Sequence, residues 1–326
     1  MTAESLDRKA DGGLLADAAA GLWCDPPVLP AKWLYDERGS KLFDEITRLP
    51  EYYPTRREAA ILTAHAADVV AATGAHTIIE FGSGTSTKTR KLLSAFASHA
   101  ESVGDATSAP RYIPVDVSTE ILESSAAILA ADYPGIEIEP LVGDFTDTEL
   151  QLPGTPGERL VVFLGGTIGN FDDAQRSRFL LGLARAMSPG DTFLLGADLI
   201  KDTGRLVAAY NDKSGVTADF NKNVIEVLRT GLDARGLYAD DFDHIARWNP
   251  AQHRIEMWLR TRREVRAYLA ALDREWLLPA GTEMRTEIST KFDRATLSTE
   301  LAAVGLSPVA SWTDPFGDFV VTLTRR

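Results

Sequence analysis

The sequence predicts an α/β protein with a doubly wound, Rossmann-like sheet that is interrupted by a second, inserted domain. The first sign is that Thr77–Phe81, a short apolar run, leads into the glycine turn Gly82–Gly84 and then into a helical pattern. The second is that strand-like runs and helical patterns alternate up to about residue 200, as in sheets with crossover helices. The third is that this alternation stops between about 200 and 290 and then resumes, which indicates an insertion.

Ahead of the core, the pattern predicts three helices. A short Ala-rich helix is expected over 14–22, and an amphipathic helix is expected over 40–49. Thr55 and Glu58 match a capping box, with Thr as the N-cap and Glu as the N3 residue. A third helix is therefore expected from Thr55 to about Ala72.

Within the core, strands and helices are expected to alternate. Strands are predicted near 77–81, 111–115, 136–142, 159–164 and 191–197, and helices near 86–99, 118–131, 172–187 and 203–211. A helix over 293–304 and two strands, over 309–312 and 318–324, would close the sheet as a hairpin. The insertion is expected to hold a helix over 217–232 and a strand over 254–260. We therefore expect a core of residues 58–200 and 291–326, and a second domain of residues 1–57 and 201–290.

Composition restricts the partners of the chain. Its 326 residues are 44% hydrophobic, which is enough for a packed core, and its net charge is −13, from 34 basic and 47 acidic residues. No run of five basic residues occurs. Because nucleic acids and anionic membranes bind clustered Lys and Arg, we expect neither as a partner and favour a small-molecule or protein substrate.

Cysteine and histidine usage argue against disulfides and metals. Cys24 is the single cysteine, and no signal peptide opens the chain. No apolar run approaches the roughly 18 residues of a membrane helix. The five histidines show no metal-binding spacing, so no metal is expected. We therefore expect a cytoplasmic protein, and a monomer because no heptad or large apolar stripe occurs.

The turn after the first predicted strand is the first candidate binding site. Glu80 precedes Gly82 and Gly84, but the third position of a dinucleotide fingerprint is Thr87 instead of glycine. A carboxylate beside the turn suits a ligand with a cationic end and hydroxyls, and would repel a pyrophosphate. The pattern resembles the first motif of class I S-adenosylmethionine (SAM) methyltransferases. A dinucleotide site and a purely structural turn stay open at this point.

Acidic residues at the ends of the next two strands favour SAM. Asp116 ends the second strand, where a carboxylate can accept both ribose hydroxyls of an adenosine, although it could instead be a helix N-cap. Asp144 ends the third strand, where it could accept from the adenine amine beside Phe145; a plain Asp turn is the alternative. Three such signals at successive strand ends together indicate SAM.

Lys88 and Asn170 are two further candidates. Lys88 is expected in the first turn of the helix after the glycines, where the helix dipole disfavours a cation. It could bind the carboxylate of SAM or be a surface lysine. Asn170 follows the fourth strand, where its amide could accept from a substrate amine and donate to a carboxylate. The alternative is an asparagine in a tight left-handed turn.

Five segments together resemble the L-histidine Nα-methyltransferases of ergothioneine biosynthesis. They follow in the same order and extend the resemblance from about residue 20 to the C-terminus: Lys32–Asp36, Leu49–Arg56, Glu80–Ser86, Phe163–Asn170 and Arg254–Leu259. The resemblance implies a class I SAM-methyltransferase fold with an inserted substrate-binding domain. It also implies SAM as cofactor and the transfer of three methyl groups to the α-amine of L-histidine, which gives hercynine.

The same resemblance implies roles for individual residues. SAM would be held by Gly82, Ser83, Lys88, Asp116, Asp144 and Phe145. L-Histidine would be held by Tyr52, Gly165, Asn170, Tyr210, Met257, Glu287 and Ser289. Tyr35 and Asn170 would be the catalytic residues beside the amine, Asn170 and Tyr210 would hold the carboxylate, and Glu287 and Ser289 would read the imidazole with Tyr52.

The spacing of Glu287 and Ser289 agrees with this assignment. Two residues apart on a strand, their side chains point to the same face. A carboxylate and a hydroxyl can bind both imidazole nitrogens. A substrate whose side chain lacks these nitrogens can be rejected roughly 10⁴-fold. Two other functions stay open: a SAM methyltransferase of another small amine or amino acid, and a SAM- or adenosine-binding regulator without catalysis.

Overall fold

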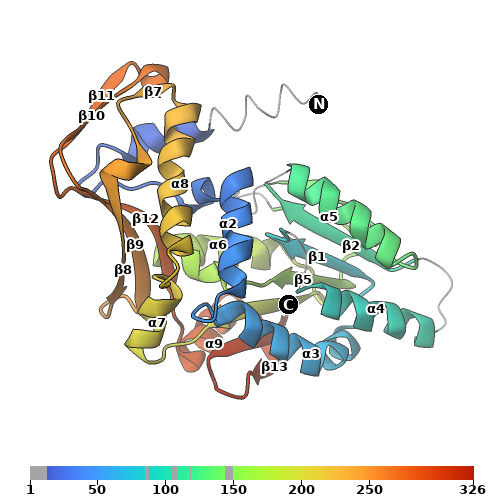
Figure 1. The fold of residues 1–326 in the computed structure, drawn as a ribbon. Helices are drawn as coiled ribbons and strands as arrows, with labels where there is room; N and C mark the ends of the chain where they lie inside the picture. Colours follow the sequence, from blue (N-terminus) through green and yellow to red (C-terminus); the bar gives the residue numbers. More distant parts are fainter. Residues whose placement is uncertain (1–12, 85–87, 104–108, 118, 144–149) are drawn as a thin grey trace. The chain divides into compact units, whose positions relative to one another are not determined.

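The computed structural model describes residues 13–84, 88–103, 109–117, 119–143 and 150–326 (Figure 1). The chain divides into two compact units. The core unit comprises Pro54–Ile200 and Thr290–Arg326, and the inserted unit comprises the segment ending at Tyr53 together with Lys201–Ser289. The core unit begins at Pro54 and resumes at Thr290, against the expected 58 and 291.

The core unit is built on an eight-stranded sheet. Its order is β13-β14-β6-β5-β1-β2-β3, and β4 also pairs with β2. The strands from β1 to β6 pair in parallel, while β14 runs antiparallel to β6 and forms a hairpin-like pair with β13. The bounds are β1 Thr77–Phe81, β2 Arg111–Asp116, β3 Glu137–Ile138, β4 Leu141–Val142, β5 Arg159–Phe163, β6 Thr192–Asp198, β13 Ser307–Thr313 and β14 Phe319–Arg325.

One predicted strand, over 136–142, is in fact two. β3 and β4 are separated by Glu139 and Pro140, and both pair with β2. Pro140 has no backbone N–H to donate to the ladder, so the strand is interrupted there.

Helices cover both faces of this sheet (Figure 1). Ile78 packs in a cluster with apolar residues of α3, α4 and α5, whereas its neighbour Ile79 packs in a cluster with residues of α6 and α9. Successive residues of a buried parallel strand point to opposite faces, which is why both are apolar. The helix bounds are α3 Pro54–Thr73, α4 Arg90–Val103, α5 Thr119–Asp132, α6 Asp173–Ala186 and α9 Arg294–Ala303.

Two local predictions in the core unit were wrong. Helix α3 begins at Pro54 instead of Thr55, which suits proline because the first helical N–H needs no partner. The Glu58 carboxylate binds Lys88 and the Gly165 N–H, so it does not form the predicted capping box. Helix α4 begins at Arg90, so Lys88 lies in a turn ahead of it and outside its first turn. The buried Thr89 side chain donates to Glu80 and anchors this turn on β1.

The inserted unit combines helices with two small sheets of order β12-β9-β8 and β11-β10-β7. A helix over 13–21 opens its described part. The other helices are η1 Ala31–Leu34, α2 Glu37–Arg48, α7 Thr203–Ala209, α8 Val216–Gly231, η3 Ala239–Asp241 and η4 Ala270–Leu272. The strands are β7 Ala234–Arg235, β8 Phe242–Asn249, β9 Arg254–Thr261, β10 Val265–Leu269, β11 Arg274–Leu278 and β12 Glu283–Thr290. Among these strands, β9 was predicted over its length, and the strand placement of Glu287 and Ser289 agrees with β12.

Candidate active site

The core unit places two loops side by side at one edge of its sheet. Strand β1 pairs in parallel with β5, and the chain continues from β1 to β2 on one side and from β5 to β6 on the other. This is the topological switch point of a doubly wound sheet, where such folds bind ligands beyond the carboxyl ends of the strands. The loop after β1 contains Gly82–Gly84, and the loop after β5 contains Gly165–Asn170.

The glycine turn is held by the neighbouring strand. The Gly82 N–H donates to the Val115 carbonyl at 2.8 Å, and the Gly84 N–H donates to Oδ2 of Asp116 at 2.9 Å. Gly82 and Gly84 have φ values of 66° and 50°, in the left-handed region that favours glycine. The structure therefore brings the predicted site residues Gly82, Ser83 and Asp116 together. The alternative role of Asp116 as a helix cap involves Ser118, which lies outside the described residues.

Two features of this turn fit a polar ligand such as SAM. The Ser83 Oγ is buried and has no hydrogen-bond partner among the described residues. Buried hydroxyls normally have a partner, so a polar ligand atom at this place would satisfy it. Among the described residues, no atom would lie within 4 Å of a Cβ added to Gly84, so this part of the structure leaves space beside the turn. Asp144 and Phe145, the predicted adenine contacts, lie outside the described residues.

Lys88 joins the two loops through Glu58. Its Nζ lies 2.5 Å from Oε2 of Glu58, and the fully buried Glu58 carboxylate also accepts from the Gly165 N–H at 2.8 Å. A Cβ at Gly165 would lie 3.2 Å from the Lys88 Nζ, and a Cβ at Gly196 would lie 2.0 Å from Oε1 of Glu58. Lys88 is thus an ion-paired lysine at the switch point, and Glu58 is a residue that sequence reasoning missed because it was assigned to a helix cap.

Glu80, which the sequence suggested as a partner for a cationic ligand, is turned into the core unit. Its carboxyl group accepts from the hydroxyls of Thr89 and Tyr112, and only 4% of the residue is exposed. Burial raises the pKa of Glu80 from 4.5 to about 7, against the lowering effect of these two hydrogen bonds and of the Lys88 charge. Glu80 therefore fixes β1 against β2 and the turn before α4.

Asn170 ends a short 3₁₀ helix, η2 Thr167–Asn170, that follows the β5 loop. Gly166 before this helix has the left-handed conformation, with φ of 69°, whereas Asn170 is not among the described residues with positive φ. The alternative of an asparagine in a left-handed turn is therefore wrong. Its half-buried carboxamide makes no side-chain hydrogen bond with another described residue, so both of its ends are available to a ligand.

The inserted unit brings the predicted substrate residues together from distant parts of the chain. The Tyr210 hydroxyl lies 2.8 Å from the Ser289 Oγ, and the Tyr52 and Tyr210 rings pack edge to face with centroids 6.0 Å apart. Burial raises the pKa of Tyr35 well above 10, and the nearby charge of Glu287 raises it further, followed by Tyr52 and Tyr210. These three tyrosines, named the tyrosine cluster from here on, therefore lie around the Glu287–Ser289 face of β12.

Two phenylalanines complete this cluster and were missed as site residues. Phe43 lies 5.4 Å from Tyr35 and 6.0 Å from Tyr52 between ring centroids, and Phe220 lies 5.3 Å from Tyr35. In the sequence, Phe43 has the helical spacing of an ordinary core residue. Only its contacts with Tyr35 and Tyr52 in the folded protein place it in the cluster.

Glu287 and Ser289 share one face of β12, as predicted. They are 8% and 5% exposed, so a carboxylate and a hydroxyl are held largely away from solvent. Met257, on β9, is buried and belongs to the same apolar cluster as Tyr52 and Tyr210. Its carbonyl accepts from the Thr286 hydroxyl at 3.1 Å, which ties β9 to β12.

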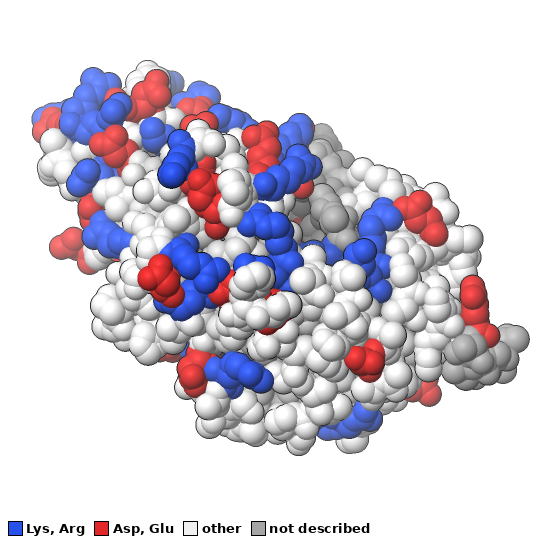
Figure 2. Space-filling model, turned by 60° about the horizontal axis from the view of Figure 1, so that its bottom comes forward, with Lys and Arg blue, Asp and Glu red and all other residues white. Residues whose placement is uncertain are grey.

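Surface charge is mixed on the face seen in Figure 2, where Lys and Arg side chains are interspersed with Asp and Glu. Within the described ranges, no group of three or more His, Cys, Asp and Glu side chains could hold a metal ion. Within the same ranges, no helix has the length and apolar character needed to cross a membrane.

Comparison with known proteins identifies the family. A family model described as "Histidine-specific methyltransferase, SAM-dependent" matches residues 14–326. The chain is 51% identical over 313 residues to the histidine N-alpha-methyltransferase of Mycolicibacterium smegmatis, covering 96% of this chain and 95% of that one. It is 48% identical over 319 residues to the protein of the same name in Mycobacterium tuberculosis, covering 97% of each chain. The chain belongs to the SAM-dependent, histidine-specific methyltransferases.

Proposed function

We propose that this protein transfers three methyl groups from SAM to the α-amine of L-histidine, giving hercynine, as a step of ergothioneine biosynthesis. The observation that carries the proposal is the Tyr210–Ser289 hydrogen bond of 2.8 Å beside Glu287, within the tyrosine cluster of a histidine-specific methyltransferase. A further relative, ergothioneine biosynthesis protein 1 of Neurospora crassa, is 37% identical over 203 residues, which are 61% of this chain and 22% of that protein.

The cofactor would be held at the switch point of the core unit. We assign Gly82, Ser83, Lys88 and Asp116 to this task, together with Asp144 and Phe145 from outside the described residues. The unpartnered Ser83 Oγ and the open space at Gly84 support the assignment. When bound, SAM supplies an electrophilic methyl group to the amine nitrogen.

The imidazole of the substrate would be read by Glu287 and Ser289. A buried carboxylate and a hydroxyl lose their water partners, so they favour a ligand that offers two ring nitrogens. An amino acid with an apolar side chain would offer these two groups no hydrogen bond, which can reduce kcat/KM by roughly 10⁴-fold. Tyr52 and Met257 would border the ring, and Tyr210 with Asn170 would hold the carboxylate.

The amine would be oriented by Asn170, near Gly165, and by Tyr35. Alignment of reacting groups can by itself lower a barrier by roughly 7–11 kcal/mol. The amine loses its proton to water before each transfer, so a strong general base is not required. Because burial and then the Glu287 charge raise the pKa of Tyr35 above 10, its phenol is neutral at physiological pH. Tyr35 can therefore donate a hydrogen bond or relay a proton to water, and its ring can favour the cationic product by about 0.5–2 kcal/mol.

The direct test is to incubate the protein with SAM and L-histidine and to follow the products by mass spectrometry. We expect three added methyl groups on histidine, and little transfer to phenylalanine, methionine or tryptophan. Equal transfer to those amino acids would favour the methyltransferase of another small amine. Binding of S-adenosylhomocysteine without transfer to any amino acid would favour a regulator.

Asn170→Ala tests the site itself. Removal of the carboxamide is expected to abolish methylation because the amine and carboxylate lose a shared partner. The affinity for S-adenosylhomocysteine, measured by calorimetry, should stay within a few fold of the wild type. Unchanged turnover in this variant would refute the role of Asn170.

We propose a monomer in the cytoplasm that binds neither nucleic acid nor membrane, in keeping with a net charge of −13. Size-exclusion chromatography with light scattering would measure the mass in solution, and a mass of twice 35.5 kDa would contradict the monomer.

A further inference from the structure

A chain of polar side chains runs behind the tyrosine cluster and ends on the backbone of Tyr210. The Thr286 Oγ1 lies 2.5 Å from Oδ1 of Asn221, the Asn221 Nδ2 lies 2.9 Å from Nδ1 of His244, and the His244 Nε2 lies 2.9 Å from the Tyr210 carbonyl. These residues come from β12, α8, β8 and the end of α7. Asn221 and Thr286 are 0% and 1% exposed, so their end of this hydrogen-bonded series is buried, and His244 is half-buried.

The chemistry of the partners decides the direction of both hydrogen bonds of the His244 ring. The Asn221 Nδ2 also lies 3.1 Å from the Trp258 carbonyl, which can only accept, so this end of the amide must be the donating NH₂ group. Nδ1 of His244 therefore accepts from Asn221, and the ring proton sits on Nε2. The Tyr210 carbonyl requires the same tautomer because it too can only accept.

A protonated imidazole does not fit this place. With a proton on both nitrogens, Nδ1–H of His244 would face the NH₂ group of Asn221, donor against donor. Burial lowers the pKa of His244 from 6.5, against the raising effects of the Tyr210 carbonyl and the Asp212 charge. The ring is therefore neutral at physiological pH.

Tyr210 is held at two points. His244 binds its backbone carbonyl, and Ser289 contacts its hydroxyl. Tyr210 follows the last residue of α7, a helix of only seven residues, so its position is not fixed by a long helix. The His244 bond to its carbonyl and the 2.8 Å contact of its hydroxyl with Ser289 hold both ends.

We propose that His244, as the Nε2–H tautomer set by Asn221, is a positioning residue that places Tyr210 for binding the amino-acid substrate. It acts through Tyr210 and does not itself touch the ligand. This inference rests on the proposed function, because it assumes that Tyr210 contacts L-histidine.

Two substitutions at His244 test its two hydrogen bonds one at a time. His244→Gln puts an amide NH₂ near the position of Nε2 and keeps a donor for the Tyr210 carbonyl. His244→Asn puts an amide oxygen near the position of Nδ1 and keeps the partner of Asn221, but loses the bond to Tyr210. His253→Asn is the matched control, because His253 is exposed in the turn between β8 and β9 and asparagine tolerates its φ of 48°.

The readout is the dissociation constant of L-histidine for the enzyme saturated with S-adenosylhomocysteine, measured by calorimetry. We expect His244→Asn to weaken histidine binding roughly tenfold, the effect of about one hydrogen bond, and His244→Gln to weaken it less than threefold. His253→Asn should change nothing. All variants should bind S-adenosylhomocysteine as the wild type does, since its predicted contacts lie in the core unit.

The outcomes distinguish the two proposals. If the wild type does not bind L-histidine in this assay, the proposed function fails. If it does, but the Asn and Gln variants bind histidine equally, the inference about His244 fails alone. Long-range proton–nitrogen NMR of histidine-labelled wild type, assigned by the signals lost in the Gln variant, gives a test that needs no folded Asn variant. A proton on Nδ1 of His244 at neutral pH would overturn the inference.

Discussion

The carboxyl group of Glu80 lies inside the core unit, where Thr89 and Tyr112 donate to its two oxygens. Burial is the largest influence on its pKa, which rises to about 7, so the group carries a proton in the folded protein below that pH. The neighbouring Lys88–Glu58 pair adds one charge that lowers the pKa of Glu80 and one that raises it. The role of a carboxylate next to the glycine turn is therefore set by its surroundings.

We predict that Glu80 makes the stability of the protein depend on pH. Its folded pKa of about 7 lies above the ordinary value of 4.5, so between these values the folded state holds a proton that the unfolded chain has lost. The free energy of unfolding should therefore fall as pH rises from about 4.5 to 7, and level off above. The full effect is about 3 kcal/mol.

Glu80→Gln isolates this contribution. Glutamine cannot titrate and can still accept from one hydroxyl, so the difference in unfolding free energy between wild type and variant should change over the same pH range. Urea unfolding at several pH values measures it. A difference that stays constant between pH 4.5 and 7 would contradict the prediction.

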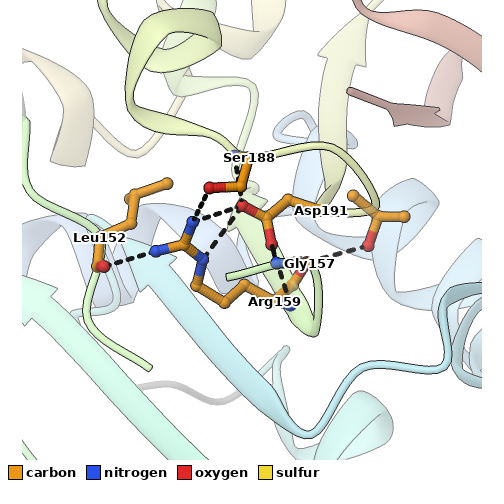
Figure 3. Close-up of polar contacts among 6 residues, drawn as sticks. Leu152, Gly157, Arg159, Ser188 and Asp191 are labelled. Atoms are coloured by element: carbon orange, nitrogen blue, oxygen red, sulfur yellow. Dashed lines mark hydrogen bonds and ion pairs between the residues drawn. The ribbon is translucent and has the colours of Figure 1, made fainter. Parts of the chain in front are cut away.

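The core-unit strands are fixed differently at their two ends. At the amino ends of β5 and β6, the buried Arg159 and Asp191 pair at 2.6 Å, and Arg159 also binds the Leu152 carbonyl and the Ser188 hydroxyl (Figure 3). At the other end, the Glu58 carboxylate of α3 accepts from the Gly165 N–H after β5. It also occupies the place that a side chain at Gly196 of β6 would take. The first end is closed by an ion pair, and the second carries the candidate site.

A pair of glycine substitutions tests this packing. Gly196→Ala would place a Cβ 2.0 Å from Oε1 of Glu58, so helix α3 or the Lys88 pair must shift, at a cost of roughly 1–3 kcal/mol. Gly182→Ala, inside α6 and with nothing within 4 Å of its Cβ, should instead stabilise the protein by roughly 0.5–1 kcal/mol. Denaturant titration of both variants gives the two signs, and equal effects would show that Glu58 does not constrain β6.

Binding of S-adenosylhomocysteine, the product of the cofactor, should stabilise the folded protein against heat. S-Adenosylhomocysteine at about 100 times its dissociation constant adds roughly 2.7 kcal/mol to stability if it binds only the folded state. We therefore expect a rise of several degrees in the apparent melting temperature, measured by differential scanning fluorimetry.

A substitution at Lys88 tests whether this residue binds the carboxylate of the ligand. Lys88→Met should reduce the thermal shift at the same ligand concentration, because the carboxylate of the ligand loses its cation. Lys91→Met removes an exposed lysine of α4 and serves as the control, with no expected change in the shift. A full shift with Lys88→Met would remove Lys88 from the cofactor site.

The sequence by itself determined the family, the class I sheet of the core unit and most of its strands. The reason is that apolar periodicity, glycine turns and acidic strand ends are local patterns, and five distinctive segments follow in a characteristic order. The resemblance to histidine methyltransferases was confirmed by a family match over residues 14–326.

Only the tertiary structure decided where side chains from distant segments go. Glu58 was assigned to a helix cap from its local sequence, yet its partner Lys88 lies thirty positions later, in the turn ahead of α4. The bond between His244 and Tyr210 joins β8 to the end of α7, and neither position has a local signal for it. A local pattern reports which face of an element is apolar, whereas a buried polar network depends on which elements pack together, and that is decided by the folded chain.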